Sequence, residues 1–229
     1  MYHNVAAVAA LTYVTIGLWI LRGLLAKTFA PSVGFWTLLV VVFGTSLFHY
    51  VTYDSLFSHG FSFFLFTLFL YCTERWHARL TVGSTIALAV VAGLITLVRP
   101  TNSIVFVFAA LYGVSDGATW RERLRLLWQQ KSLILTGMLV YVAVLVPQFA
   151  YWHDATGHWV IFSYTDETFD FAHPELANVL FSVRKGLFFW SPLLLLAVAG
   201  FWFMWQKKRP ADSDSGVHAA QSLGDRELA

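Results

Sequence analysis

The amino-acid sequence predicts an all-α membrane protein, a bundle of about seven transmembrane helices. Hydrophobic residues make up 58% of the 229 residues and charged residues only 12%, about half of the roughly 25% typical of soluble domains. The mean hydropathy is +0.63. Ten Trp and 21 Phe suit contact with lipid and with the membrane surface better than an ordinary soluble core. Low charge and many aromatic residues together favour a polytopic membrane protein.

Seven apolar stretches are candidates for transmembrane helices, which need about 20 mostly apolar residues. In chain order they are Val5–Leu25, Val33–Tyr50, Gly60–Cys72, Leu80–Val98, Ile104–Val114, Ser132–Tyr151 and Leu187–Trp205. The third and fifth have only 13 and 11 residues. We expect their polar flanks to lengthen them, or the protein to surround them as re-entrant segments.

The distribution of Lys and Arg predicts an orientation with the N-terminus outside and the C-terminus in the cytoplasm. This orientation places 12 of the 15 cations on the cytoplasmic side and leaves only Arg99, Arg184 and Lys185 outside. Short cytoplasmic loops normally carry such an excess of positive charge. The outer loops are then residues 51–59, 99–103 and 152–186.

The transmembrane bundle is predicted to cover residues 1–206, followed by a disordered cytoplasmic tail at residues 207–229, which is polar and poor in apolar residues. On the cytoplasmic side, "DGATWRERLRLLWQQK" predicts a basic amphipathic helix on the anionic inner leaflet. The lone Cys72 excludes an internal disulfide. A net charge of +2 without a basic cluster does not indicate a nucleic-acid partner.

The outer segment "VTYDSLFSHGFSFF" carries Asp54 and His59 between two apolar stretches. A histidine with a nearby carboxylate is typical of acid–base chemistry or of a site that orients a substrate hydroxyl. In the alternative interpretation, Ser58 caps the third helix and His59 merely lies at the membrane interface.

The three outer cations are candidates for contact with a phosphate. Arg99 ends an apolar stretch before Pro100, and its planar guanidinium suits phosphate; an arginine that anchors the helix end in the interface is the alternative. Arg184 and Lys185 directly precede the last span in "SVRKGLFFWSP". They suggest an anionic ligand such as a lipid phosphate, or simple anchoring to lipid headgroups.

An acidic stretch in the last outer loop is conceivable as a metal site, because carboxylates and imidazole are usual ligands. Its residues are Asp166, Glu167, Asp170, His173 and Glu175. Their spacing matches no specific ligand motif, so we predict no metal and no cofactor. Pro174 is predicted to begin a helix, and "PELANVLFSV" to form a short amphipathic helix on the outer membrane surface.

Three separated segments carry a resemblance to a known family. They are "GTSLFHYVTYDSLFSHGFSFFLFTLFLY", "GLITLVRPTN" and "FDFAHPELANVLFSVRKGLFFWSPLLLLA". Together they resemble bacterial polytopic membrane glycosyltransferases of the C-type fold, related to protein O-mannosyltransferases and to the aminoarabinose transferases of lipid A. The resemblance covers most of residues 1–200. It implies transfer of a sugar from a polyprenyl-phosphate carrier to an acceptor on the outer side of the bacterial cytoplasmic membrane.

The resemblance also assigns roles to the outer residues. Asp54 and His59 are implied to orient the substrates, and Arg99, Arg184 and Lys185 to bind the donor phosphate. The family usually has Glu-Pro where this chain has Asp54-Ser55, which leaves the local backbone shape open.

A second departure concerns the start of the chain, which resembles the family's second helix. The first helix and the outer loop with the catalytic carboxylates have no counterpart here. We therefore expect the later part of a longer protein or a truncated product, whose activity would require a partner chain that supplies the base.

The alternative from another functional class is a non-catalytic membrane protein: a scaffold, a transporter subunit or an inactive remnant. An ion-coupled transporter is disfavoured, because every Asp, Glu, Lys and Arg falls at the end of a span or in a loop, whereas transport pathways need ionisable residues within the membrane. An outer-leaflet enzyme of another chemistry, such as a ligase, is a third interpretation.

Overall fold

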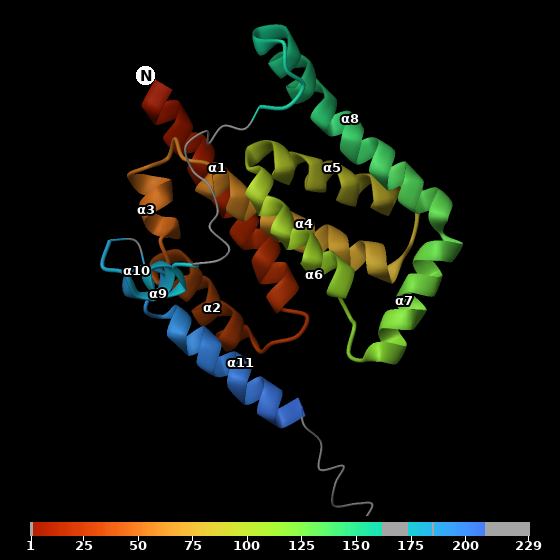
Figure 1. Ribbon diagram of the computed structural model, residues 1–229. Coiled ribbons are helices and arrows are strands. Elements are labelled where there is room, and N and C mark those ends of the chain that lie inside the picture. The colour runs from red at the N-terminus through yellow and green to blue at the C-terminus, as the bar shows by residue number, and fades with distance from the viewer. Residues whose placement is uncertain (1, 162–173, 185, 209–229) are drawn as a thin grey trace, which may run out of the picture. The chain divides into compact units, whose positions relative to one another are not determined.

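The computed structural model describes residues 2–161, 174–184 and 186–208, and all regular secondary structure within these ranges is helical. The prediction of an all-α fold is therefore confirmed for the described chain. Two compact units, Met1–His173 and Pro174–Ala229, are considered separately (Figure 1). The predicted tail, residues 207–229, lies outside the described residues except for its first two positions.

The first unit contains most of the helices. In chain order they are α1 (Tyr2–Leu25), α2 (Pro31–Phe43), α3 (Leu47–Thr52), α4 (His59–Ala78), α5 (Val82–Val98), the 3₁₀ helix η1 (Pro100–Val105), α6 (Phe106–Leu111), α7 (Gly117–Gln129) and α8 (Lys131–Thr156). The second unit contains α9 (Leu176–Phe181), α10 (Leu187–Trp190) and α11 (Leu194–Lys208).

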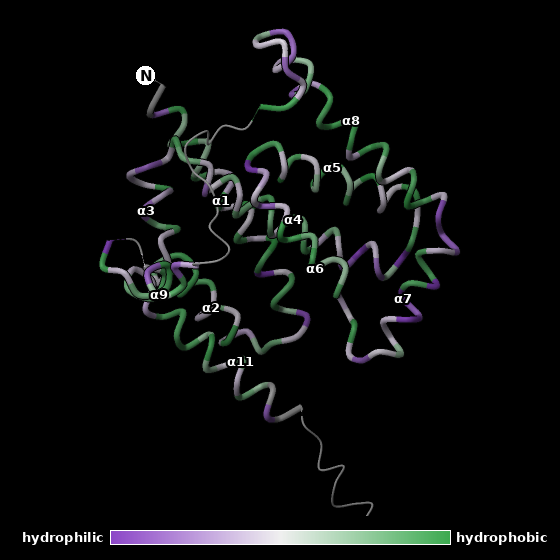
Figure 2. Tube along the Cα trace, viewed as in Figure 1, coloured by the Kyte–Doolittle hydropathy of each residue, from purple (hydrophilic) through white to green (hydrophobic). Residues whose placement is uncertain are grey.

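Two of the described helices, α1 and α8, are long and apolar enough to cross a membrane. In the most apolar 18-residue window, 17% of the residues of α1 and 0% of those of α8 are buried. Figure 2 shows hydrophobic residues along the middle of α8 and hydrophilic residues towards its ends. Apolar side chains on the outside of a helix suit lipid better than water.

The predicted continuous span Val33–Tyr50 is wrong, because the helix breaks within it. α2 ends at Phe43, and α3 begins only at Leu47. At the break, the hydroxyl of Thr45 donates to the carbonyl of Val41 at 2.6 Å and accepts from the N–H of Leu47 at 3.2 Å. Such side-chain bonds compete with the helical backbone pattern.

The structure lengthens the short third predicted span but not the short fifth one. The third is lengthened by its polar flanks, as expected, to the 20 residues of α4. The fifth begins earlier than predicted, at Pro100, but α6 already ends at Leu111, so Ile104–Val114 is not one helix. Proline at the first helical position favours this early start, since its missing N–H needs no partner there.

Two predictions in the second unit also need correction. The stretch Leu187–Trp205 is interrupted between α10 and α11, where Pro192 follows Ser191 and the helix does not resume until Leu194. The predicted helix starting at Pro174 begins instead at Leu176, with Glu175 as its N-cap residue.

The core of the first unit lies where α4 packs against α5. Its buried members are Leu65, Phe69, Cys72, Val91 and Ile95. α5 also packs along α8 (Figure 1), and small residues allow the two backbones to approach. A Cβ atom added at Gly93 of α5 would lie 2.7 Å from the Cβ of Val144, and one added at Gly137 of α8 would lie 3.1 Å from Thr85. Glycine at such contacts is typical of helix packing in membranes.

The first unit has two chemically different ends. At the α7 end, Lys27 pairs with Glu74 at 2.6 Å, so that the C-terminal ends of α1 and α4 lie together. At the opposite end, called the α3 end below, Asn102 of η1 donates to the hydroxyl of Ser62, near the start of α4, at 3.0 Å. The α3 end therefore joins residues 44–62 with residues 99–105.

Replacing Gly93 with Ala is expected to separate α5 from α8 and to destabilise the fold by about 1–3 kcal/mol, the usual cost of overpacking. The added methyl would contact the Cβ of Val144, which can move only with its backbone. Gly83→Ala on the same helix is the matched control, because nothing lies within 4 Å of its added Cβ. Thermal unfolding in detergent measures both, and equal midpoints would contradict the packing argument.

Candidate functional site

The α3 end brings Asp54 into contact with His49, a residue not selected from the sequence. The Nε2 atom of His49 lies 2.9 Å from Oδ2 of Asp54. Both side chains are about half exposed, at 56% and 43%, so a ligand can reach them from outside. The pair resembles the histidine and carboxylate of hydrolase triads, in which the acid orients the imidazole.

The geometry of the His49–Asp54 pair follows from the end of α3. The N–H groups of Tyr53 and Asp54 both bond to the carbonyl of His49, at 2.9 and 3.3 Å, which turns the chain back after Thr52. The ring of Tyr53 stacks on the imidazole of His49 with centroids 5.7 Å apart. A histidine in the last helical turn, followed five residues later by Asp, was the sequence signal for this pair.

His59 lies at the first position of α4, immediately before the predicted span that starts at Gly60. Its ring lies against Tyr50, with centroids 3.9 Å apart. Ser58 occupies the N-cap position, but its side chain makes no capping bond. The alternative prediction that the side chain of Ser58 caps the helix is therefore wrong, although Ser58 does occupy the N-cap position.

Arg99 ends α5 at the same end of the bundle and acts on His59 through its charge. Burial, and secondly the positive charge of Arg99, lower the pKa of His59 below its usual value of 6.5. The neutral imidazole is therefore favoured at neutral pH. Three of the predicted side chains, Asp54, His59 and Arg99, thus belong to one end of the bundle.

Two neighbouring polar groups complete this end of the bundle. The backbone N–H of Asn102 donates to the carbonyl of Arg99 at 2.9 Å, and its side chain holds Ser62. The hydroxyl of Ser55 is fully buried and has no hydrogen-bond partner among the described residues.

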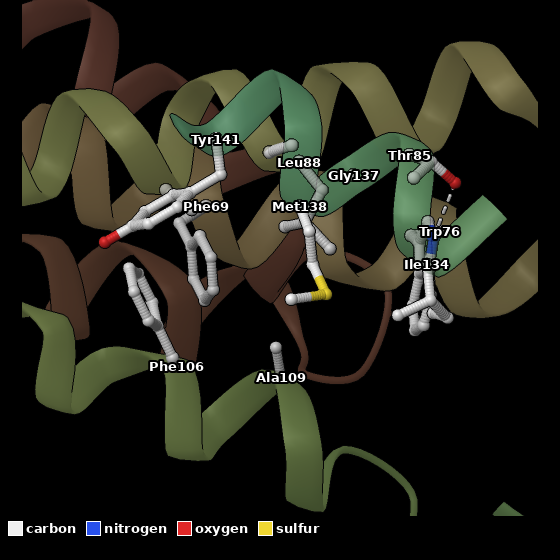
Figure 3. Close-up of a pocket in the computed structure, with 12 residues that line it drawn as sticks. Phe69, Trp76, Thr85, Leu88, Phe106, Ala109, Ile134, Gly137, Met138 and Tyr141 are labelled. Atoms are coloured by element: carbon white, nitrogen blue, oxygen red, sulfur yellow. Dashed lines mark hydrogen bonds between the residues drawn. The ribbon is translucent and has the colours of Figure 1, made fainter. Parts of the chain in front are cut away.

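An apolar cavity of about 420 Å³ lies between α4, α5, α6 and α8 (Figure 3). Its walls include Phe69, Leu88, Phe106, Ile134, Met138 and Tyr141. On one side, Trp76 donates to Thr85 at 3.0 Å. On another, the hydroxyl of Tyr141 lies 3.1 Å from that of Thr96. The polar atoms of the walls are therefore paired with one another, and the space between them suits an apolar ligand.

The cavity and Arg99 are connected through the last turn of α5. Thr96, the partner of Tyr141, precedes Arg99 by three residues. Arg99 follows the last residue of α5 with an extended backbone, so its Cα atom lies about one helical turn along the chain from Thr96. This arrangement suits a ligand that combines a long apolar chain with an anionic head.

The other two predicted phosphate contacts belong to the second unit or lie outside the described residues. Arg184 is exposed in the second unit and lines a hollow together with Asn178 and Ser182. Lys185 lies outside the described residues, as do four members of the acidic stretch: Asp166, Glu167, Asp170 and His173. The fifth, Glu175, accepts a hydrogen bond from Asn178 at 2.6 Å. Within the described ranges, no group of three or more metal-binding side chains occurs.

No protein-family model matches the chain, and neither a curated protein nor a solved structure matches it. The resemblance to C-type glycosyltransferases therefore stays a prediction from three sequence segments.

Replacing Arg99 with Gln is expected to raise the pKa of His59, because one of the two causes that lower it is removed. Folding lowers this pKa, so the unfolded chain takes up the proton first as the pH falls below about 6.5. The contribution of neutral His59 to stability is therefore complete at neutral pH and is lost as the pH falls from about 6.5 to the lower pKa that His59 has in the folded state. In Arg99→Gln the two pKa values lie closer together, so less stability should be lost on acidification.

Titration of ¹³C-labelled histidine by NMR measures the effect. Arg79→Gln, which removes a cation from the other end of α4, serves as the control. An unchanged titration of His59 in Arg99→Gln would contradict the electrostatic contact.

Proposed function

We propose that the chain is a membrane glycosyltransferase, or the C-terminal part of one, that transfers a sugar from a polyprenyl-phosphate carrier to an acceptor hydroxyl outside the bacterial cytoplasmic membrane. The observation that carries the proposal is the exposed His49–Asp54 pair, 2.9 Å apart, at the same end of the bundle as Arg99. Glycosyl transfer from such a donor needs a proton acceptor and a cation near the leaving phosphate.

In the proposed reaction, the acceptor oxygen forms a bond to the anomeric carbon while the bond from that carbon to the phosphate oxygen breaks. The bonding electrons leave with the polyprenyl phosphate. From the sequence, a partner chain is expected to supply the base, but we assign this role to His49: the hydroxyl proton passes to its Nδ1 atom, since Nε2 contacts Asp54. Asp54 then stabilises the imidazolium, and Arg99 stabilises the negative charge on the phosphate.

The apolar cavity supports a carrier with a long hydrocarbon chain. Its walls are apolar side chains, and Thr96, bonded to Tyr141 at its edge, lies one turn from Arg99. With the phosphate at Arg99, part of the polyprenyl chain would occupy this cavity.

The proposal includes a topology of about seven spans, with the N-terminus outside and the C-terminus in the cytoplasm. It places the α3 end outside and the α7 end, which carries Lys27 and Arg123, in the cytoplasm. The pairing of Lys27 with Glu74 supports the order of the spans, in which α1 and α4 end on the same side, and the excess of Lys and Arg on that side supports the orientation.

Single cysteines test this topology. In spheroplasts, a membrane-impermeant maleimide is expected to label Leu56→Cys, whose side chain is 70% exposed in the wild type. Ser115→Cys, in the loop before α7, should react only after lysis. The wild type is the control, because its own Cys72 is buried. Labelling of Ser115→Cys before lysis would contradict the orientation.

Donor turnover tests the activity. Membranes that contain the full native protein are mixed with a panel of tritiated undecaprenyl-phosphate pentoses and hexoses, and loss of label from the lipid fraction is followed. We expect His49→Gln and Asp54→Asn to lower the rate by about 10²–10⁴-fold, the usual contribution of general base catalysis. Arg79→Gln, at the opposite end of the bundle, should leave the rate unchanged.

Two results would contradict the proposal. Equal rates in His49→Gln and the wild type would exclude His49 as the proton acceptor. Absence of turnover of every donor by wild-type membranes would favour the non-catalytic scaffold.

A further inference from the structure

The chain bends sharply between α7 and α8, and the bend leaves an apolar groove. Gln130 separates the helices with a non-helical backbone, at φ −98° and ψ 29°. The groove has a volume of about 740 Å³. Its apolar walls are Leu124, Leu127 and Trp128 from α7, and Ile134, Leu135 and Met138 from α8.

The groove walls are open to the surroundings. Trp128 is 79% exposed, and Leu135 and Met138 are 58% and 62% exposed. Such a concentration of exposed apolar side chains is unfavourable in water and marks a contact surface. Lys131 is exposed at the edge of the same groove, so an occupant meets one positive charge beside an apolar surface.

α7 carries its cations beside an apolar stripe. At about 100° per residue, Trp120, Leu124 and Trp128 share one face, and Arg121 and Arg125 follow next to it. Arg123, on the other flank, is already engaged: it donates to the carbonyl of Tyr112 at 2.8 Å and lies 3.2 Å from Nε2 of His77. These contacts hold α7 against the end of the bundle with its apolar stripe outward.

We infer that the groove between α7 and α8 binds one anionic phospholipid, with an acyl chain along its apolar walls and the headgroup phosphate at Lys131. Charge decides in favour of this occupant. The edge of the groove carries Lys131, and no Asp or Glu is among the described residues that line it. A positive charge at the edge of an apolar groove complements a phosphate that is attached to a hydrocarbon chain.

The position of the groove supports the same occupant. Lys131 is the first residue of α8, one of the two described helices that can cross a membrane. The groove thus begins where an apolar helix meets a polar segment, which is the depth of phospholipid headgroups. The inference requires that α8 lies in a membrane, and it does not depend on glycosyl transfer.

Native mass spectrometry of the detergent-purified full chain, first delipidated, tests the inference. Dioleoyl phosphatidylglycerol and dioleoyl phosphatidylcholine are added in parallel, since they share acyl chains and differ in headgroup charge. We expect one bound phosphatidylglycerol, retained in preference to phosphatidylcholine. Lys131→Gln should weaken its binding about fivefold, the effect of one cation near a phospholipid headgroup.

Two further variants locate the site. Arg125→Gln removes one charge from α7 but not from the groove, and should leave binding unchanged. Leu135→Trp fills the groove without changing charge, and should displace both lipids. Thermal unfolding verifies that each variant is folded.

Three results would overturn the inference. An equal loss of phosphatidylglycerol in Lys131→Gln and Arg125→Gln would indicate diffuse attraction to the surface. Unchanged lipid binding in Leu135→Trp would place the lipid elsewhere. A dimer that forms without lipid and is abolished by Leu135→Trp would assign the groove to a second copy of the chain.

Discussion

The close packing of α5 against α8 is the contact on which both ends of the first unit depend. Gly93 and Gly137 allow the two backbones to approach, and both helices supply walls of the apolar cavity. Arg99 lies at the end of α5, and Lys131 begins α8. One helix pair therefore sets the position of the candidate phosphate contact at the α3 end and of the cationic groove edge at the α7 end.

The sequence predicted the all-α fold, which depends on composition, whereas the orientation predicted from the distribution of Lys and Arg stays a prediction. Low charge and long apolar stretches are enough to predict an all-α fold with apolar helices. The break between α2 and α3 was missed because it arises where a side-chain hydroxyl competes with the backbone for hydrogen bonds. The hydroxyl of Thr45 satisfies backbone groups near Gly44, and no hydropathy average over residues 33–50 detects such a bond. The interruption after Ser191 coincides with Pro192, which has no N–H to continue the helical hydrogen bonds.

The candidate site was predicted in part for a related reason. Asp54, His59 and Arg99 were selected because polar residues between apolar stretches are conspicuous. His49 lies inside an apparently continuous span, where a lone histidine is usually assigned to packing. Because α3 ends at Thr52, the chain turns back there and brings the carboxylate of Asp54 within 2.9 Å of the imidazole of His49. Because the end of α3 was not predicted from the sequence, His49 was not identified as the partner of Asp54.

The two histidines at the α3 end differ in what surrounds them, and this difference bears on which can accept a proton. His59 lies against Tyr50 and within the field of Arg99, so its protonated form is disfavoured. The side chain of His49 is half exposed, and its Nε2 atom lies 2.9 Å from a carboxylate oxygen of Asp54. An imidazole that accepts a proton becomes positively charged. In the proposed transfer, the exposed imidazole with a carboxylate partner is therefore assigned the proton, and His59 is suited to donate or accept hydrogen bonds as a neutral ring.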